Sequence, residues 1–349
     1  MKPVIVTIPS IADPIKRSPG FEKKELATHK LDIMGLCQFG CKYCSSNEGN
    51  YLRINRQKFA DMTREQTGEA LLPATSPELS FRWGDFEKRL AAQLRTKPDP
   101  IFAAERWGYG KTLVFSQLTD AFSPWAVTEG LTERTLDKVL RRTGFRIRVL
   151  TKSAIVGTDH WIRLFDQWPG RFVVGLSVGT LDDEWARHVE VGTSSPTARV
   201  KALRRLQDAG VPTFGMLCPV FPHALAGNGV EALVDAIRPE RCETVWSEPF
   251  NDRNNWRAVA EGHREGSPER KVLSMLFEGP SARNYWSDYA VALYRRVHDA
   301  LGAEAHKHRS LLYQDTMTVE TRDAMRGREG VLFQSDGSRK SKALPMVAP

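Results

Sequence analysis

The chain has 349 residues, of which 41% are hydrophobic and nine are tryptophan, a composition that excludes a disordered chain and supports a large core. No stretch is long and apolar enough to cross a membrane, and Met1-Lys2-Pro3 begins no apolar signal segment, so we expect a cytoplasmic protein without membrane contact. The formal net charge of +8 favours an anionic partner, nucleic acid above all, although many basic proteins bind none.

The first 24 residues are expected to form an irregular lead-in, because four prolines between positions 3 and 19 would interrupt any regular element. A short apolar strand is predicted at 30–35. Residues 45–111 then form an insertion that mixes arginine and lysine with aromatic side chains. This insertion is too long for a plain loop, so it is expected to contain helices.

From residue 112 onward, short apolar runs alternate with helical patterns, which is typical of parallel β/α units. Strands are predicted at 112–116, 146–151, 172–178, 211–220 and 244–248. Helices are predicted at 132–142, 159–168, 195–210 and 230–237, with Thr132 and Ser195 as N-caps. Together with the strand at 30–35 these units predict an α/β fold, a partial (β/α)6 TIM-like barrel whose active site lies at the carboxyl ends of its strands.

The partial barrel is expected to occupy residues 25–255. Residues 256–334 are predicted to form a helical C-terminal cap, with one helix opening at Ser267 and another covering 284–301. The last stretch, 335–349, is polar and basic without periodicity and is expected to be a disordered tail.

Three of the five cysteines, Cys37, Cys41 and Cys44, lie in one short loop after the first predicted strand. Thiolates at this spacing can turn toward one metal centre, and three of them leave one iron of a [4Fe–4S] cube open to a small molecule. A structural zinc site would need a fourth donor, such as His29 or Cys218. A disulfide would leave an odd cysteine and suits a reducing compartment poorly, and inert thiols are a further possibility.

The Cys-x3-Cys-x2-Cys run, with Tyr43 before the third cysteine, resembles the cluster loop of the radical S-adenosylmethionine (SAM) superfamily. Five later segments are similar to its spore photoproduct lyase-like branch, often described as DNA repair photolyase-like: 116–120, 150–153, 176–190, 195–210 and 212–222. The resemblance implies a [4Fe–4S] cluster on the three cysteines that cleaves SAM reductively to a 5′-deoxyadenosyl radical, which abstracts hydrogen from a substrate. It also implies a reducing partner such as flavodoxin or ferredoxin.

The same resemblance assigns further residues to SAM. Tyr43 would lie beside the adenine, and Thr119 and Asp120 near the methionine moiety. Lys152 and Ser177 would bind the carboxylate. The chemistry is suitable, because the ammonium and carboxylate of SAM need a buried acceptor and a buried donor. A turn cap at Asp120 and a solvated strand-end lysine at Lys152 are the alternatives.

Other polar residues near predicted strand ends are candidates from position. Arg199, in the first turn of its helix, could reach SAM or a phosphate. Glu248 and Asn251 end the sixth strand and could hold the ribose or the substrate, or form a structural turn. Glu190 could organise the fourth loop or lie on the surface as an ordinary carboxylate.

One departure from the branch concerns its hydrogen-atom donor. Spore photoproduct lyases carry a cysteine just before the Ser/Thr-Asp stretch, and it supplies a hydrogen atom to the substrate radical. The stretch that this chain resembles is preceded by Ser116-Gln117-Leu118, without a thiol. Cys218, at the end of the fifth predicted strand, could face the cavity and act as the catalytic thiol instead, or it could be a small buried hydrophobe. Cys242 precedes the sixth strand at the opposite end of the barrel and is expected to be inert.

Three functions remain open from the sequence. The first is a radical SAM enzyme acting on a nucleic acid base, in repair or modification, which the positive charge and the basic–aromatic insertion favour. The second keeps the cofactors and replaces the substrate by a peptide or small metabolite. The third is a zinc- or cluster-stabilised nucleic-acid-binding module without catalysis. A monomer is expected, because the mouth of the site must admit a large partner.

Overall fold

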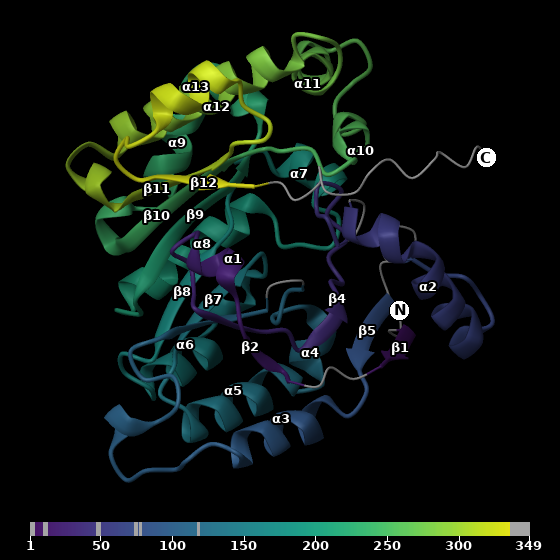
Figure 1. Ribbon diagram of the computed structural model, residues 1–349, viewed down its shortest axis with the longest axis vertical. Helices are drawn as coiled ribbons and strands as arrows, with labels where there is room; N and C mark the ends of the chain where they lie inside the picture. Colours follow the sequence, from purple (N-terminus) through teal and green to yellow (C-terminus); the bar gives the residue numbers. More distant parts are fainter. Residues whose placement is uncertain are drawn as a thin grey trace.

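The computed structural model describes residues 4–9, 13–46, 50–72, 76, 79–116 and 119–335. Its mixed α/β architecture confirms the predicted class: a large sheet, a small sheet and helices packed around both (Figure 1). No helix within these ranges is long and apolar enough to span a bilayer.

The large sheet has nine strands in the described part of the chain. Across the sheet they follow the order β2 (Ile15–Arg17), β3 (His29–Leu31), β6 (Thr112–Phe115), β7 (Arg146–Thr151), β8 (Phe172–Leu176), β9 (Thr213–Val220), β10 (Cys242–Pro249), β11 (His308–Tyr313) and β12 (Val331–Gln334). Neighbouring pairs from β3 to β12 are parallel, and β2 is antiparallel to β3. The strands after residue 111 that the sequence predicts are confirmed as β6 to β10, each within two residues of the predicted bounds.

Helices cover the sheet and join its strands. They are α1 (Pro19–Glu22), α2 (Asn50–Thr67), α3 (Phe86–Arg95), α4 (Pro124–Thr128), α5 (Leu131–Arg142), α6 (Asp159–Asp166), α7 (Asp183–Val189), α8 (Pro196–Asp208), α9 (Gly229–Ala236), α10 (Trp256–Ala260), α11 (Pro268–Phe277), α12 (Ala282–Leu301) and α13 (Val319–Met325). The hydroxyls of Ser195 and Ser267 cap α8 and α11 as predicted. The predicted cap at Thr132 is wrong: α5 begins one residue earlier, after a left-handed Gly130 (φ 67°), and the Thr132 hydroxyl donates to the Ala121 carbonyl instead.

The first predicted strand, 30–35, is divided between the two sheets. Its beginning is β3 of the large sheet, whereas its end is β4 (Met34–Leu36), which pairs antiparallel with β5 (Leu79–Trp83). The small sheet is completed by β1 (Val4–Ile8), parallel to β5. A continuous apolar run cannot reveal that its two halves have different partners, because those partners are distant in sequence. The small sheet and α2 lie beside the large sheet, on the right in Figure 1.

The irregular lead-in predicted for residues 1–24 is wrong for its described part, which holds β1, β2 and α1. The prolines adjoin these elements rather than interrupting them. Pro9 follows β1, and Pro14 precedes β2. Pro19 is the first residue of α1, where a missing N–H costs no helical hydrogen bond.

The two faces of the large sheet are both buried but differ in their partners. One face packs through residues such as Val149, Leu176 and Leu217 against the helices that connect the strands. On the other, inner face, Phe214 and Met216 of β9 pack with Trp246 of β10. Cys218 continues the same alternation, which places it on the inner face at the carboxyl end of β9.

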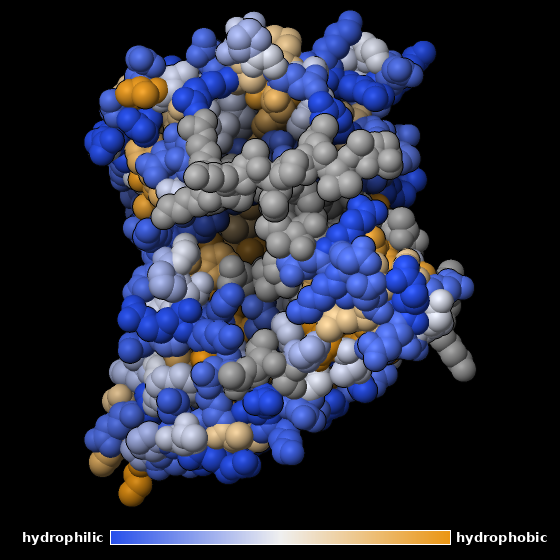
Figure 2. All heavy atoms as spheres, turned by 45° about the vertical axis from the view of Figure 1, so that its right-hand side comes forward, coloured by the Kyte–Doolittle hydropathy of each residue, from blue (hydrophilic) through white to orange (hydrophobic). Residues whose placement is uncertain are grey.

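The C-terminal region contains the expected helices α11 and α12, and it also supplies β11 and β12 to the large sheet. The prediction that residues 256–334 form a purely helical cap is therefore wrong. The apolar run of β11 is too short for periodicity to distinguish a strand from a buried helical segment. Of the predicted tail, residues 336–349 lie outside the described residues. The face in Figure 2 is largely hydrophilic, with apolar side chains in a hollow near its middle.

Candidate functional site

The cysteine loop follows β4 and is held by backbone hydrogen bonds to the last residue of α7 and to the segment after it. The Lys42 N–H donates to the Val189 carbonyl (2.8 Å), and the Gly192 N–H donates to the Phe39 carbonyl (2.7 Å). A side chain at position 192 would place its Cβ 3.0 Å from the Phe39 backbone, so any residue other than glycine requires the loop to shift by a few tenths of an ångström. Within the loop, the Cys44 N–H donates to the Cys41 carbonyl.

The three thiols of this loop are a donor set that could hold an iron–sulfur cluster or, with a fourth ligand, a zinc ion. Cys41 is buried, and Cys37 and Cys44 are half-buried. Among the described residues, no three histidine, cysteine, aspartate or glutamate side chains are already arranged around one ion position. A cube takes each thiolate on a different iron, so its ligands need not converge on one point. Burial raises the pKa of the Cys37 and Cys41 thiols, and metal binding, which takes thiolates, has to displace those protons.

His29 and Cys218, the two residues considered as a fourth zinc ligand, contact other protein groups. His29 packs against the rings of Trp107 and Phe145, with its Nδ1 beside the Thr28 hydroxyl (2.9 Å). The Cys218 thiol donates a hydrogen bond to the carboxylate of Glu248 on the neighbouring strand.

Glu190 joins the cysteine loop to the sheet through a buried charge network. It is 2% exposed, so the alternative of a surface carboxylate is wrong. Its carboxylate accepts hydrogen bonds from the Tyr43 hydroxyl and the Arg199 guanidinium, and Lys152 Nζ lies 3.6 Å from Oε1. Burial alone would raise the pKa of Glu190, but Arg199 and Lys152 hold that pKa below its ordinary range. Glu190 is therefore an anion that orients two cations and Tyr43.

Arg199 is fully buried rather than facing an open mouth. Its guanidinium also donates to the Ser177 carbonyl, so this side chain acts on the site through Glu190 and the end of β8. The structure thus brings Arg199 next to the other predicted residues but engages its guanidinium with protein groups.

Lys152 and Ser177 meet at the carboxyl ends of β7 and β8. Lys152 Nζ donates to the Ser177 hydroxyl, which donates to the Cys218 carbonyl. The ammonium also lies over the Tyr43 ring, 5.5 Å from its centroid. The alternative of a solvated lysine is therefore wrong, because the side chain of Lys152 is only 14% exposed.

Asp120 is buried and has protein partners on both carboxylate oxygens. It accepts from the Thr151 hydroxyl (2.7 Å), the Lys152 N–H (2.8 Å) and the Phe122 N–H (2.9 Å). These bonds cap the turn and tie the loop after β6 to β7, as the turn-cap alternative expects, while a contact of Asp120 with SAM stays a prediction. Burial raises its pKa despite these donors. The neighbouring Thr119 hydroxyl is buried with no partner among the described residues, which leaves it available to a ligand.

A second polar group lies further along the inner face. The Cys218 thiol donates to Glu248 Oε2 (2.9 Å), and the Tyr313 hydroxyl donates to Glu248 Oε1. Arg253 lies over the Tyr313 ring at 4.7 Å. Burial raises the pKa of Cys218 well above its usual value, so this residue is a thiol. Cys218 is half-buried against the apolar cluster of the inner face, as the small-hydrophobe alternative expects, and its thiol also has a polar partner in Glu248.

Sequence reasoning missed Tyr313, because β11 lies in the region expected to be helical. The only signal was an aromatic hydroxyl at the end of an apolar run. Asn251 is linked to Tyr313 through Thr316, whose hydroxyl donates to Asn251 Oδ1 (3.2 Å) and whose N–H donates to the Tyr313 carbonyl (3.0 Å). Cys242 begins β10 at the other end of the sheet, buried beside Gln207. Of the predicted departure before Thr119, Gln117 and Leu118 lie outside the described residues.

Five consecutive strands thus each contribute one polar side chain to a connected row on the inner face. We call this row the polar belt; in strand order from β7 to β11 it consists of Lys152, Ser177, Cys218, Glu248 and Tyr313. It lies at the carboxyl ends of parallel strands, where α/β folds bind ligands. Through Glu190 and Tyr43 it is continuous with the cysteine loop.

No protein-family model matches the chain. Two relatives are each 24% identical to it: an uncharacterized protein of Acidianus two-tailed virus, over 203 residues, and an uncharacterized protein of Methanocaldococcus jannaschii, over 127 residues. These matches cover 56% and 36% of this chain, and 63% and 46% of the relatives. The chain therefore spans less than two thirds of either relative.

Solved structures of spore photoproduct lyase are similar over most of the chain. A complex with dinucleoside spore photoproduct, and a variant with bound AdoMet and the same dinucleoside, each match 88% of this chain and 81% of their own with a TM-score of 0.53. The chain has the fold of spore photoproduct lyase. Sequence identity is 15%, so the predicted resemblance to this branch is confirmed at the level of the fold.

Proposed function

We propose that this protein is a radical SAM enzyme that acts on a base of nucleic acid, in repair or modification. The observation that carries the proposal is the continuity between the three-cysteine loop and the polar belt through Glu190 and Tyr43. Further support comes from the neighbours of like fold, spore photoproduct lyases, of which one variant holds AdoMet and a dinucleoside photoproduct. The net charge of +8 is consistent with a nucleic acid partner.

The cofactors assigned are a [4Fe–4S] cluster and SAM. Cys37, Cys41 and Cys44 would hold the cluster, and the large sheet would serve as the partial (β/α)6 barrel of the superfamily, extended by β11 and β12. When bound, the cluster supplies the electron that cleaves SAM to a 5′-deoxyadenosyl radical. We place the enzyme in the cytoplasm as a monomer, with a flavodoxin or ferredoxin as reductant.

The residues of this chain bind and orient SAM in the proposal. Lys152, with Ser177, supplies a charged donor for the SAM carboxylate, and Thr119 supplies a free hydroxyl. Tyr43 packs beside the adenine. Glu190 keeps Lys152 and Tyr43 in position. Its carboxylate remains ionised because the positive charge of Arg199 stabilises it. Asp120 acts by fixing the backbone at Lys152.

Cys218 is proposed as the hydrogen-atom donor to the substrate radical. Its S–H bond would break as a C–H bond forms on the base, leaving a thiyl radical on Sγ. Glu248 positions the thiol, and the high pKa of Cys218 keeps the hydrogen on sulfur.

The first test is anaerobic reconstitution with iron and sulfide, followed by dithionite and SAM, with 5′-deoxyadenosine measured by chromatography. We expect a brown protein that forms 5′-deoxyadenosine, and loss of both properties when Cys37, Cys41 and Cys44 are replaced by alanine. Cys242→Ala is the control and should retain both, because it lies at the opposite end of β10. A colourless protein with about one zinc per chain and no SAM cleavage would replace the enzyme by a binding module.

The role of Cys218 is tested in D2O with damaged or modified oligonucleotides as substrates. The thiol exchanges with solvent, so the product should carry deuterium at the reacting carbon. Cys218→Ala should still form 5′-deoxyadenosine but lose most of the product and its deuterium, because the substrate radical then has no thiol from which to take a hydrogen atom. Deuterated product at the normal rate from Cys218→Ala would assign the donor to another group.

A further inference from the structure

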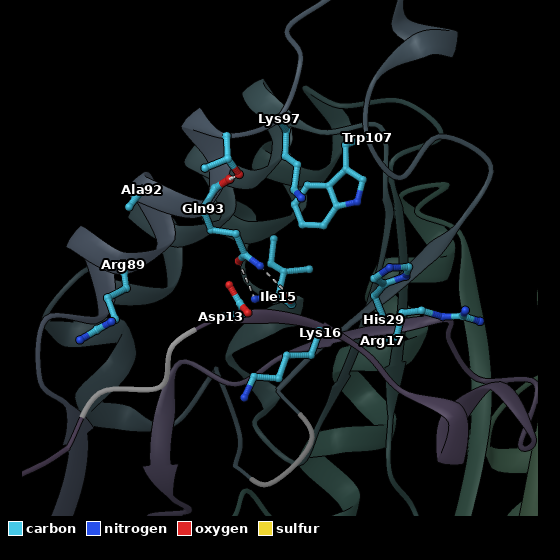
Figure 3. A pocket seen from close by; sticks show the side chains of 11 residues that line it. Asp13, Ile15, Lys16, Arg17, His29, Arg89, Ala92, Gln93, Lys97 and Trp107 are labelled. Carbon is cyan, nitrogen blue, oxygen red and sulfur yellow. Dashed lines mark hydrogen bonds between the residues drawn. The ribbon is translucent and has the colours of Figure 1, made fainter.

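A cavity of about 600 Å3 lies away from the polar belt, at the edge of the large sheet. It is bounded by β2, by α3 and by the loop that carries Trp107, and His29 of β3 is in its wall (Figure 3). No residue of the polar belt or of the cysteine loop lines it. The site already described therefore does not account for this cavity.

The lining is strongly positive. It contains Lys16, Arg17, Arg89 and Lys97 against a single carboxylate, that of Asp13. Arg17 is paired with Glu22 outside the lining (3.0 Å). Lys16, Arg89 and Lys97 have no carboxylate within 4.0 Å among the residues that the structure describes. Unpaired cations around a concave surface raise the local potential and attract anions.

The walls that present these cations are joined by hydrogen bonds. Gln93 of α3 forms two hydrogen bonds with the backbone of Ile15 on β2, accepting from its N–H (2.9 Å) and donating to its carbonyl (2.8 Å). The Ile15 side chain is buried in the core, so strand and helix are fixed to each other. In Figure 3 these bonds lie between Lys16 and Lys97. Cations on a fixed frame lose less conformational freedom when a ligand binds.

An aromatic wall completes the cavity. Lys97 lies over the Trp107 ring (4.8 Å), and His29 meets the same ring edge-on (6.3 Å between centroids). Burial, with Lys111 and Arg17, lowers the pKa of His29, so the imidazole is neutral and adds no positive charge. A mixture of cations and aromatic rings of this kind is typical of surfaces that follow a nucleic acid backbone.

The cavity runs along β2 toward the segment that leads to the cysteine loop. Arg17 is opposite His29, at the start of β3, and Ile15 is opposite Leu31, at its end. After Leu31 the chain continues through β4 directly into Cys37. A strand bound in the cavity would therefore extend toward the end of the molecule where the cysteines lie.

We propose that this cavity binds the phosphodiester backbone of the nucleic acid substrate on one side of the reacting base. The inference rests on the proposed function and deepens it by assigning a backbone-binding subsite separate from the chemistry. Lys16, Arg89 and Lys97 each neutralise a phosphate, and Trp107 holds Lys97 in place.

The test is binding of a fluorescently labelled single-stranded oligonucleotide, followed by anisotropy over a series of salt concentrations. Lys16→Ala/Arg89→Ala/Lys97→Ala should weaken binding about tenfold or more and reduce the salt slope by about 2, since each lost phosphate contact removes about 0.7 for single strands. The matched control is Arg163→Ala/Lys201→Ala/Arg295→Ala, three exposed cations on α6, α8 and α12 that lower the net charge equally. The control should bind almost as tightly as the parent protein.

Equal loss of affinity in both triple variants would overturn the proposal, because general charge would then explain binding. Displacement of the labelled strand by submillimolar mononucleotide or inorganic phosphate would also overturn it, in favour of a small-anion site. Circular dichroism checks the fold, and Arg89→Gln/Lys97→Gln repeats the test with less change of side-chain volume. Formation of 5′-deoxyadenosine without substrate should be unchanged in every variant. If the parent protein itself formed no 5′-deoxyadenosine, the proposed function would be contradicted, whereas the result of the binding experiment would still hold.

Discussion

At the scale of single residues, Glu190 is the side chain on which most of the candidate site depends. The Arg199 guanidinium that it neutralises is fully buried, and a buried cation without its partner is costly. Glu190→Gln should lower the free energy of unfolding by about 3–5 kcal/mol, measured by urea denaturation. Asp159→Asn, which breaks an exposed ion pair with Arg205, is the control and should cost about 1 kcal/mol or less. An equal loss of unfolding free energy in the two variants would show that the buried Glu190 network contributes no more to stability than an exposed ion pair.

His308 predicts a dependence of stability on pH. It is fully buried with Nε2 at 2.8 Å from the Ser247 hydroxyl, and burial lowers its pKa to about 3. In the unfolded chain its pKa is about 6.5, so between these values the unfolded state binds more protons and stability falls as the pH falls. From pH 7.5 to pH 5 this group should remove about 2 kcal/mol from the free energy of unfolding.

The comparison that isolates His308 is urea unfolding at both pH values for the parent protein and for His308→Gln, which cannot titrate. The variant should lose less stability between pH 7.5 and pH 5. Parallel losses in the two proteins would mean that His308 is not held neutral in the folded state.

What the sequence could predict at this scale follows from locality. The cysteine spacing is a local pattern, and Lys152 and Ser177 are found because they stand at the ends of recognisable strands. The contact between Tyr43 and Glu190 joins residues 147 positions apart, and no local pattern reveals it. Tyr313 was missed for the same reason, since its partner Glu248 is 65 positions away.

At the scale of elements, the docking of the cysteine loop on the segment after α7 depends on Gly192. Gly192→Ala would place a methyl group against the Phe39 backbone, so the loop must move. Overpacking of this kind costs about 1–3 kcal/mol, and we expect less iron per chain after reconstitution, measured by iron content and absorbance near 400 nm. Gly20→Ala, in α1 with no atom within 4 Å of the added carbon, should leave iron loading unchanged. Full loading of Gly192→Ala would show that the loop tolerates displacement.

Elements were predictable where their own residues determine them. Strands β6 to β10 are buried runs, and burial on both faces gives each the continuous apolar signal of a parallel strand. The small sheet was not predictable, because β1, β4 and β5 pair across segments of unrelated sequence. The prolines of the first 24 residues were misleading for a simpler reason: they stand at the ends of elements.

At the scale of the whole molecule, β11 and β12 continue the large sheet, so residues 256–334 should unfold together with the rest. Leu312→Ala, at a fully buried position of β11, should cost about 2–5 kcal/mol in one transition seen alike by tryptophan fluorescence and circular dichroism. Val319→Ala, half-exposed on α13, should change stability by no more than about 0.5 kcal/mol. Two separated transitions would instead describe an independent C-terminal domain.

The order of strands in the large sheet has a consequence for synthesis. Within the large sheet each strand from β3 to β12 pairs with the large-sheet strand that comes before it in the chain, although β4 and β5 of the small sheet lie between β3 and β6 in sequence. A ribosome therefore releases the strands of the large sheet in the order in which they pair. The growing polypeptide then has one advancing edge, and each new β/α unit can be added to it without rearranging the earlier ones. The cysteine loop and the segment with Glu190 leave the ribosome well before β11. Tyr313 therefore completes the polar belt only after the part of the chain with the three-cysteine loop and Glu190 has emerged from the ribosome.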